Sequence, residues 1–140
     1  MKMSVKISLI VFSFVSIAII LLAFNEITLF TIKSSAPEIH ATKLAVIIDG
    51  DNIQHPGREC KIVIRAVDDN GVLDTSRNDT IQIAINAGPT ARVSSEIVTL
   101  KNGEATVMII TYVSELVYIY AYWVSGPSYL DVGHNLVHYI

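Results

Sequence analysis

The chain has 140 residues, 51% of them hydrophobic, and a formal net charge of −3 at pH 7. This length allows one folded domain at most, because single cores usually occupy about 100 to 200 residues, and the apolar content excludes a disordered chain. From residue 43 onward eleven acidic residues stand against seven Lys and Arg. No basic cluster can therefore neutralise a phosphate backbone, and we expect no nucleic acid as a partner.

The excess of apolar residues lies at the start of the chain. The segment 7–24, ISLIVFSFVSIAIILLAF, contains no charged residue. As a helix it would span about 27 Å, close to the roughly 30 Å hydrocarbon core of a bilayer. Because this run is longer than the apolar part of most signal peptides, we predict a membrane anchor over residues 1–24. A cleaved signal peptide, with Lys2 and Lys6 as its positive start, is the alternative.

The flanks of this segment predict its orientation. Lys2 and Lys6 precede it, whereas Asn25 and Glu26 follow it. Positive flanks stay on the cytoplasmic side, so we predict a single-pass protein of the cell membrane with its N-terminus inside and the remainder outside. If the segment is cleaved, the remainder is secreted. Residues 25–42 include Ser-Ser-Ala-Pro and are predicted to be a linker.

The rest of the chain has the pattern of an all-β sandwich, because β-branched and aromatic runs recur between Gly, Asn, Asp and Pro. The expected strands cover residues 43–49, 60–68, 79–86, 96–100, 104–113, 115–126 and 135–140. Ile81, Ile83 and Ile85 share one face of the third strand, which predicts that this face is buried. Between the fourth and fifth strands, Lys-Asn-Gly predicts a hairpin turn with Gly103 at positive φ.

Cys60 is the single cysteine of the sequence, so it cannot form an internal disulfide. It alternates with Ile62 and Ile64 along the second strand, which predicts a small buried hydrophobic side chain. A free thiol that bridges two chains is the alternative.

The order of four turn-and-strand motifs resembles the bacterial immunoglobulin-like domains of the invasin and intimin type. The motifs are VDDNGVLD from Val67, DTIQIAIN from Asp79, NGEATVMI from Asn102 and VYIYA from Val117. The resemblance covers residues 43–140. It implies an immunoglobulin-like antiparallel β-sandwich of about seven strands, and an extracellular, non-enzymatic module that serves as a spacer, a structural element or an adhesive surface.

An oxygen-rich cluster between the second and third strands raises the question of a calcium site. Its members are Asp68, Asp69, Asn70, Asp74 and Asp79. Their spacing does not fit an EF-hand loop. We predict instead a turn in which Asn70 and Gly71 take positive φ, with a non-standard calcium loop as the alternative.

The histidines and possible nucleophiles do not form a recognisable catalytic or metal site. His134 and His138 are four residues apart, which on a strand separates them by about 13 Å and prevents them from sharing one zinc ion. The sequence has no nucleophile motif of the Gly-x-Ser-x-Gly type. We therefore expect no enzyme, no catalytic or metal-binding residue and no cofactor.

Two features are candidates for modification or binding. Asn78-Asp79-Thr80 is a glycosylation sequon, so Asn78 is a glycosylation candidate. In the sixth strand, alternation places Val117, Ile119, Ala121 and Trp123 on one face and Tyr118, Tyr120 and Tyr122 on the other. The three tyrosines are the candidate interaction surface. Ordinary cross-strand pairs that stabilise the sheet are the alternative.

These features predict a membrane-anchored surface protein with a structural or cell-adhesion role. Its partners would be the membrane and another surface protein, a glycan or further copies of itself. One alternative is a subunit of an envelope filament or surface layer, in which terminal strands pair edge to edge, as the apolar end NLVHYI indicates. Another is an accessory ectodomain of a membrane complex.

Overall fold

A computed structural model of the protein describes residues 36–140. The predicted anchor and residues 25–35 of the predicted linker lie outside the described residues. Residues 39–140 form one compact unit. Within the described part, no helix is long and apolar enough to cross a membrane.

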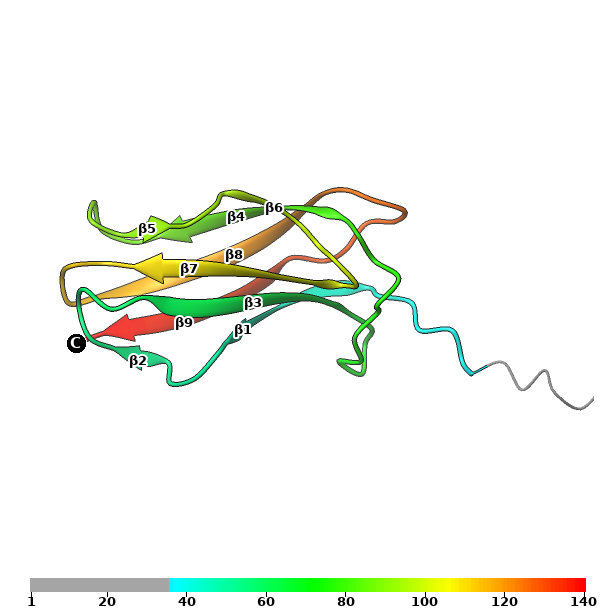
Figure 1. The fold of residues 1–140 in the computed structure, drawn as a ribbon, viewed down its shortest axis with the longest axis horizontal. Coiled ribbons are helices and arrows are strands. Elements are labelled where there is room, and N and C mark those ends of the chain that lie inside the picture. Colours follow the sequence, from blue (N-terminus) through cyan, green and yellow to red (C-terminus); the bar gives the residue numbers. More distant parts are fainter. Residues whose placement is uncertain (1–35) are drawn as a thin grey trace, which may run out of the picture. The chain divides into compact units, whose positions relative to one another are not determined.

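The described residues form two β-sheets, whose strands run side by side in Figure 1. The strands are β1 (Lys43–Ile48), β2 (Ile53–Gln54), β3 (Cys60–Val67), β4 (Thr80–Asn86), β5 (Arg92–Val93), β6 (Ile97–Thr99), β7 (Glu104–Ile110), β8 (Glu115–Ser125) and β9 (Gly133–Tyr139). One sheet has the order β1-β3-β7-β5 and the other β2-β9-β8-β4-β6. Neighbouring strands are antiparallel, except that β2 runs parallel to β9.

This arrangement is a β-sandwich, in which the two sheets enclose one hydrophobic core. The all-β sandwich predicted from the sequence is confirmed, and each of the seven expected strands is present within a few residues of its predicted ends. Sequence reasoning missed β2 and β5. Each has two residues, too few to show an alternating pattern.

The core is built from alternate residues of strands in both sheets. Ile62 and Ile64 of β3 are fully buried, as are Val117 and Ile119 of β8. On β4, Ile81 and Ile83 are buried as predicted, whereas Ile85 lies near the sandwich edge and is half-buried. The two-residue period of a strand thus determines which side chains stabilise the fold.

The last residues of the predicted linker belong to the sandwich. Ala41 is buried, and its N–H donates a hydrogen bond to Asp74 Oδ2 at 3.0 Å. The N–H of Thr42 donates to the carbonyl oxygen of Val67 at 2.9 Å. The compact unit therefore begins before β1.

The C-terminal strand lies inside its sheet. β9 pairs with β8 on one side and with β2 on the other, and Val137 and Tyr139 are fully buried. The Tyr139 hydroxyl donates a hydrogen bond to the carbonyl oxygen of Ile109 in the opposite sheet at 3.0 Å. Burial of Val137 and Tyr139 in the core of this chain accounts for part of the apolar end, whereas Ile140 is exposed, and the filament alternative stays a prediction.

Tyr139 makes the stability of the fold sensitive to alkaline pH. Burial raises the pKa of its phenol from 10 to about 12, so the folded protein holds this proton more tightly than the unfolded chain. The stability that Tyr139 contributes is fully present below pH 10 and is lost as the pH rises from 10 towards 12. In thermal unfolding over this range, Tyr139→Phe should show a shallower decline than the parent. Equal slopes would contradict the assignment.

The predicted hairpin between the fourth and fifth expected strands is wrong, although its turn exists. Asn102 and Gly103 both take positive φ, 51° and 79°, between the paired residues Lys101 and Glu104. However, β6 pairs with β4 in one sheet and β7 pairs with β3 in the other. The turn residues determine a local reversal, whereas the sheet that each strand joins depends on distant partners.

Cys60 is buried, as predicted, with 2% of its surface exposed. A thiol at this depth cannot bridge two folded chains.

Burial also raises the pKa of the Cys60 thiol, which lowers the fraction of reactive thiolate. We expect a disulfide reagent such as dithionitrobenzoate to leave Cys60 unmodified in the folded protein and to titrate it fully in guanidinium chloride. A Ser114→Cys variant, at an exposed loop position, provides the control, with one thiol of two reacting in the folded state. Rapid reaction of Cys60 in the folded parent would contradict this result.

Candidate binding face

The two sheets differ in the charge of their strands. Lys43, Lys61, Arg65, Arg92 and Glu104 lie in the strands of the sheet β1-β3-β7-β5. Three of these side chains take part in ion pairs on the surface, Lys61 with Asp49 and Arg65 with Glu104. The five strands of the other sheet contain a single residue of the Asp, Glu, Lys and Arg set, Glu115.

Glu115 does not charge the outer face of that sheet. Its carboxylate accepts hydrogen bonds from the Thr111 hydroxyl and from the backbone N–H of Gly88, which lie in the connections at the end of the sandwich. The strands β2, β9, β8, β4 and β6 therefore contribute only uncharged polar, aromatic and aliphatic side chains and two histidines to the outer face of their sheet. We call this surface the neutral face. The carboxylate nearest to it is that of Glu96, which directly precedes β6 and lies beside Gln82 and Ala84 at the edge of the sheet.

The three candidate tyrosines lie along the middle strands of the neutral face. In the antiparallel register, Tyr118 is opposite Leu136, Tyr120 opposite His134, and Tyr122 opposite Gln82. Tyr118 and Tyr122 are exposed to 41% and 39%, and Tyr120 is half-buried between its neighbours. The predicted separation from the buried Val117, Ile119 and Ala121 is confirmed.

The rings on this face are ordered relative to one another. The ring centroids of Tyr120 and Tyr122 are 6.2 Å apart and their planes differ by 21°. The ring of His134 lies 6.4 Å from that of Tyr120. The central part of the neutral face thus contains one pair of nearly parallel tyrosine rings, with the tilted ring of His134 beside it.

Polar and aliphatic side chains occupy different parts of the neutral face. Gln82 and His134 lie beside the tyrosine row, and Asn86 is opposite Tyr118. Exposed aliphatic side chains lie on the outer strands, Ile53 on β2 at 48% and Ile97 on β6 at 53%, and at the start of β8, where Leu116 is 43% exposed. The centre can therefore donate and accept hydrogen bonds, whereas the margins are apolar.

A buried ion pair holds the loop at one end of this sheet, and sequence reasoning missed it. Arg77 donates to both carboxylate oxygens of Asp79, at 2.8 and 2.6 Å, and also to the carbonyl oxygen of Ser128 at 2.5 Å. Trp123 Nε1 donates to Asp79 Oδ2 at 2.9 Å. A Cβ at Gly126 would collide with this carboxylate, so glycine permits the close approach.

The carboxylates of the oxygen-rich cluster accept hydrogen bonds from the turn after β3 and from the segment before β1. Asp68 Oδ1 accepts hydrogen bonds from the N–H groups of Asn70 and Val72 at 2.9 and 2.8 Å. In that turn Gly71 takes positive φ, at 81°, but Asn70 does not, contrary to our prediction. The Asp68 carboxylate supplies the tight turn that two positive-φ residues would otherwise have formed.

The Asp74 carboxylate likewise accepts hydrogen bonds from neighbouring groups of the fold. Burial alone would raise its pKa, but hydrogen bonds from the Ser76 hydroxyl and from the N–H groups of Ala41 and Ser76 outweigh burial and lower it. The residues described by the structure include no group of three or more His, Cys, Asp or Glu arranged to hold a metal ion. The calcium alternative gains no support from this geometry.

The remaining sequence candidates are separate from one another. His134 and His138 both lie on the neutral face, one opposite Tyr120 and the other opposite Leu116. Asn78 is exposed at the turn before β4, where its side-chain oxygen accepts a hydrogen bond from the N–H of Asn102 at 3.3 Å. Its glycosylation stays a prediction.

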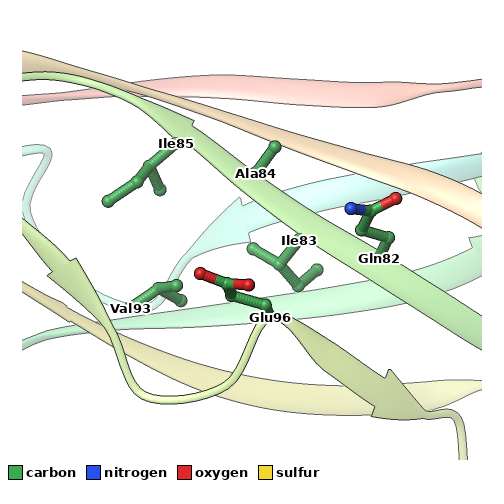
Figure 2. Close-up of a pocket in the computed structure, with 6 residues that line it drawn as sticks. All are labelled: Gln82, Ile83, Ala84, Ile85, Val93 and Glu96. Carbon is green, nitrogen blue, oxygen red and sulfur yellow. The ribbon is translucent and has the colours of Figure 1, made fainter.

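A small groove lies beside the segment that connects β5 and β6, where the chain crosses from one sheet to the other. β5 pairs with β7, and a few residues later β6 pairs with β4. Figure 2 shows the crossing beside β4, with Val93 and Glu96 near Ile83. The groove has a volume of about 240 Å³, less than the roughly 300 to 1,000 Å³ of most small-molecule pockets. It is a product of the strand crossing rather than a formed ligand site.

Comparisons with known proteins show the fold. No family model and no curated protein matches the chain. Among solved structures, it is similar to a glycosyl hydrolase family 2 member from Bacteroides cellulosilyticus, with a TM-score of 0.62 and 11% identity over 72% of this chain and 14% of that chain. It is also similar to Parabacteroides merdae beta-glucuronidase, with a TM-score of 0.57 and 14% identity over 74% of this chain and 13% of that chain.

The D00-D0 domain of intimin is a third similar structure. It matches with a TM-score of 0.51 and 18% identity, over 77% of this chain and 51% of that chain. The chain thus spans a small part of the two enzymes and about half of the intimin fragment. The match to intimin supports a bacterial immunoglobulin-like domain, the fold that the sequence motifs implied.

Proposed function

We propose that this protein presents one immunoglobulin-like sandwich at the cell surface and acts there in adhesion, without enzymatic activity. The N-terminal apolar segment would serve as the membrane anchor. The observation that carries the proposal is the difference between the two outer faces. One has the ion pairs of an ordinary soluble surface, and the other is a neutral face with a row of exposed tyrosines.

The exposed tyrosines favour a binding role over sheet stabilisation alone. Tyrosine side chains offer a large rigid contact area at little entropic cost, together with a hydroxyl for hydrogen bonding. Exposed aromatic side chains gathered on one face are enriched at interaction sites. The intimin match supports the same proposal at the level of fold.

Adhesion of cells that display the full-length protein tests this function. We expect the double variant Tyr118→Thr/Tyr122→Thr to reduce binding of such cells to a host-cell or extracellular-matrix surface by about tenfold, because central aromatic residues dominate most interfaces. Threonine retains the β-propensity of the strand.

The matched control is Tyr112→Thr, at a tyrosine that is 65% exposed in the connection after β7 and lies outside the neutral face. This control should adhere like the parent. Equal adhesion of all three proteins would contradict the proposed function of the face.

The anchor has a separate test, since it lies outside the described residues. Mass spectrometry of the mature protein should find the N-terminal peptide, and a protease added to intact cells should cleave residues 36–140. A mature chain that starts after residue 24 would replace the anchor with a cleaved signal peptide.

A further inference from the structure

We propose that the ligand of the neutral face is an uncharged polysaccharide, which stacks its sugar rings on the row formed by Tyr118, Tyr120 and Tyr122. This inference rests on the proposed function of the face, and it names the chemical class of the ligand.

The absence of charged groups on the neutral face sets the first limit on the ligand. Phosphate, sulfate and uronate groups are bound in proteins mainly by Arg and Lys, which form charge-assisted hydrogen bonds with them. The strands of this sheet contain neither residue. An anionic polysaccharide or lipid would therefore find no counter-charge among these strands, whereas a neutral ligand needs none.

The geometry of the rings matches a sugar chain. A pyranose ring has an apolar face of C–H groups and a rim of hydroxyl groups, so it packs flat on an aromatic ring and forms hydrogen bonds around it. The nearly parallel rings of Tyr120 and Tyr122 provide adjacent flat contacts, and Tyr118 extends the row along the same strand. Gln82, Asn86 and the tyrosine hydroxyls provide donors and acceptors beside it.

The distribution of polar groups disfavours a second copy of this chain as the occupant. Protein interfaces usually have an apolar centre and a polar rim. The neutral face has the reverse order, with hydroxyl, amide and imidazole groups at its centre and exposed aliphatic groups at its margins, Ile53 and Ile97 on the outer strands and Leu116 at the start of β8. A ligand rich in hydroxyl groups satisfies such a centre, whereas a second apolar sheet would leave these groups without partners.

A glycan array tests the proposal with the full-length protein in detergent. The probes are neutral oligomers of glucose, mannose, galactose and N-acetylhexosamines, together with oligogalacturonate and sulfated oligosaccharides. We expect binding to at least one neutral oligomer, with no weakening as the salt concentration rises, because screening affects only charged contacts. The Tyr118→Thr/Tyr122→Thr variant should bind at least about tenfold more weakly, and Tyr112→Thr should bind like the parent.

Several outcomes would overturn the inference. These are binding to the acidic probes alone, binding that the double variant retains, and an array without neutral binding. Concentration-dependent self-association that the double variant abolishes, in the absence of glycan binding, would assign the face to a second copy. If adhesion still depends on the tyrosines while the neutral probes do not bind, the proposed function stands and the ligand class is wrong. Thermal unfolding of each variant establishes that a loss of binding is not a loss of fold.

Discussion

Asp79→Ala should lower the free energy of unfolding by about 3 to 5 kcal/mol, the usual cost of leaving one partner of a buried ion pair unpaired. Asp79 and Arg77 are 1% and 5% exposed, so water cannot replace the lost carboxylate at the guanidinium. The same substitution removes the acceptor of Trp123 Nε1. Urea denaturation of the parent and the variant measures the difference.

The matched control for this substitution is Asp49→Ala. Asp49 pairs with Lys61 at 2.7 Å, but both side chains are about half exposed. Exposed ion pairs contribute little because water solvates each partner after the other is removed. We expect no measurable change in stability for this variant. Equal losses for Asp79→Ala and Asp49→Ala would contradict the structural role of the buried pair.

Tyr139→Ala should destabilise the fold by about 3 to 5 kcal/mol, the range for removal of a large buried aromatic side chain. Tyr139 is fully buried on the penultimate residue of the chain, and its hydroxyl joins the two sheets through Ile109. Loss of this side chain leaves a cavity in the core and removes the hydrogen bond from its hydroxyl to the Ile109 carbonyl oxygen. Differential scanning calorimetry of the two proteins measures the effect.

His138→Ala provides the neighbouring control on the same strand. His138 is exposed on the neutral face, opposite Leu116. We expect the free energy of unfolding of this variant to differ from that of the parent by no more than about 0.5 kcal/mol, as for most surface substitutions. A protein that tolerates Tyr139→Ala equally well would show that β9 is not part of the core.

The sequence was sufficient to predict the faces of the long strands. The alternation in β8 placed its three tyrosines on one face of the strand and Val117 and Ile119 on the other face, and the structure confirms that separation. This success has a simple cause, because successive side chains on a strand point to opposite sides whatever the strand pairs with. Cys60 was placed in the core by the same rule.

The buried ion pair could have been found by extending that rule by two residues. Arg77 and Asp79 have the same parity as Ile81 and Ile83, so they continue the inward face of β4. Opposite charges on a buried face must pair. The Asp-rich composition of the region drew attention to metal binding, whereas the position of each carboxylate relative to the core decides its role.

The neutral face could not be predicted from any single strand. It arises because β2, β9, β8, β4 and β6 share one sheet, and that order depends on contacts between residues far apart in the chain. The error in the predicted hairpin has the same origin, since the turn at Gly103 does not determine which sheet β6 and β7 join. Pairing is a tertiary property, so local patterns define strands more reliably than sheets.

Chemical footprinting of tyrosines on adherent cells tests most directly whether the neutral face binds the partner. Cells that display the protein would be iodinated or nitrated while free and while attached, and modification at each tyrosine would be measured by mass spectrometry. We expect attachment to protect Tyr118 and Tyr122, and to leave Tyr112 and Tyr129, which are 65% and 60% exposed, as reactive as before. Unchanged modification of Tyr118 and Tyr122, or protection of Tyr112 and Tyr129 alone, would contradict the account.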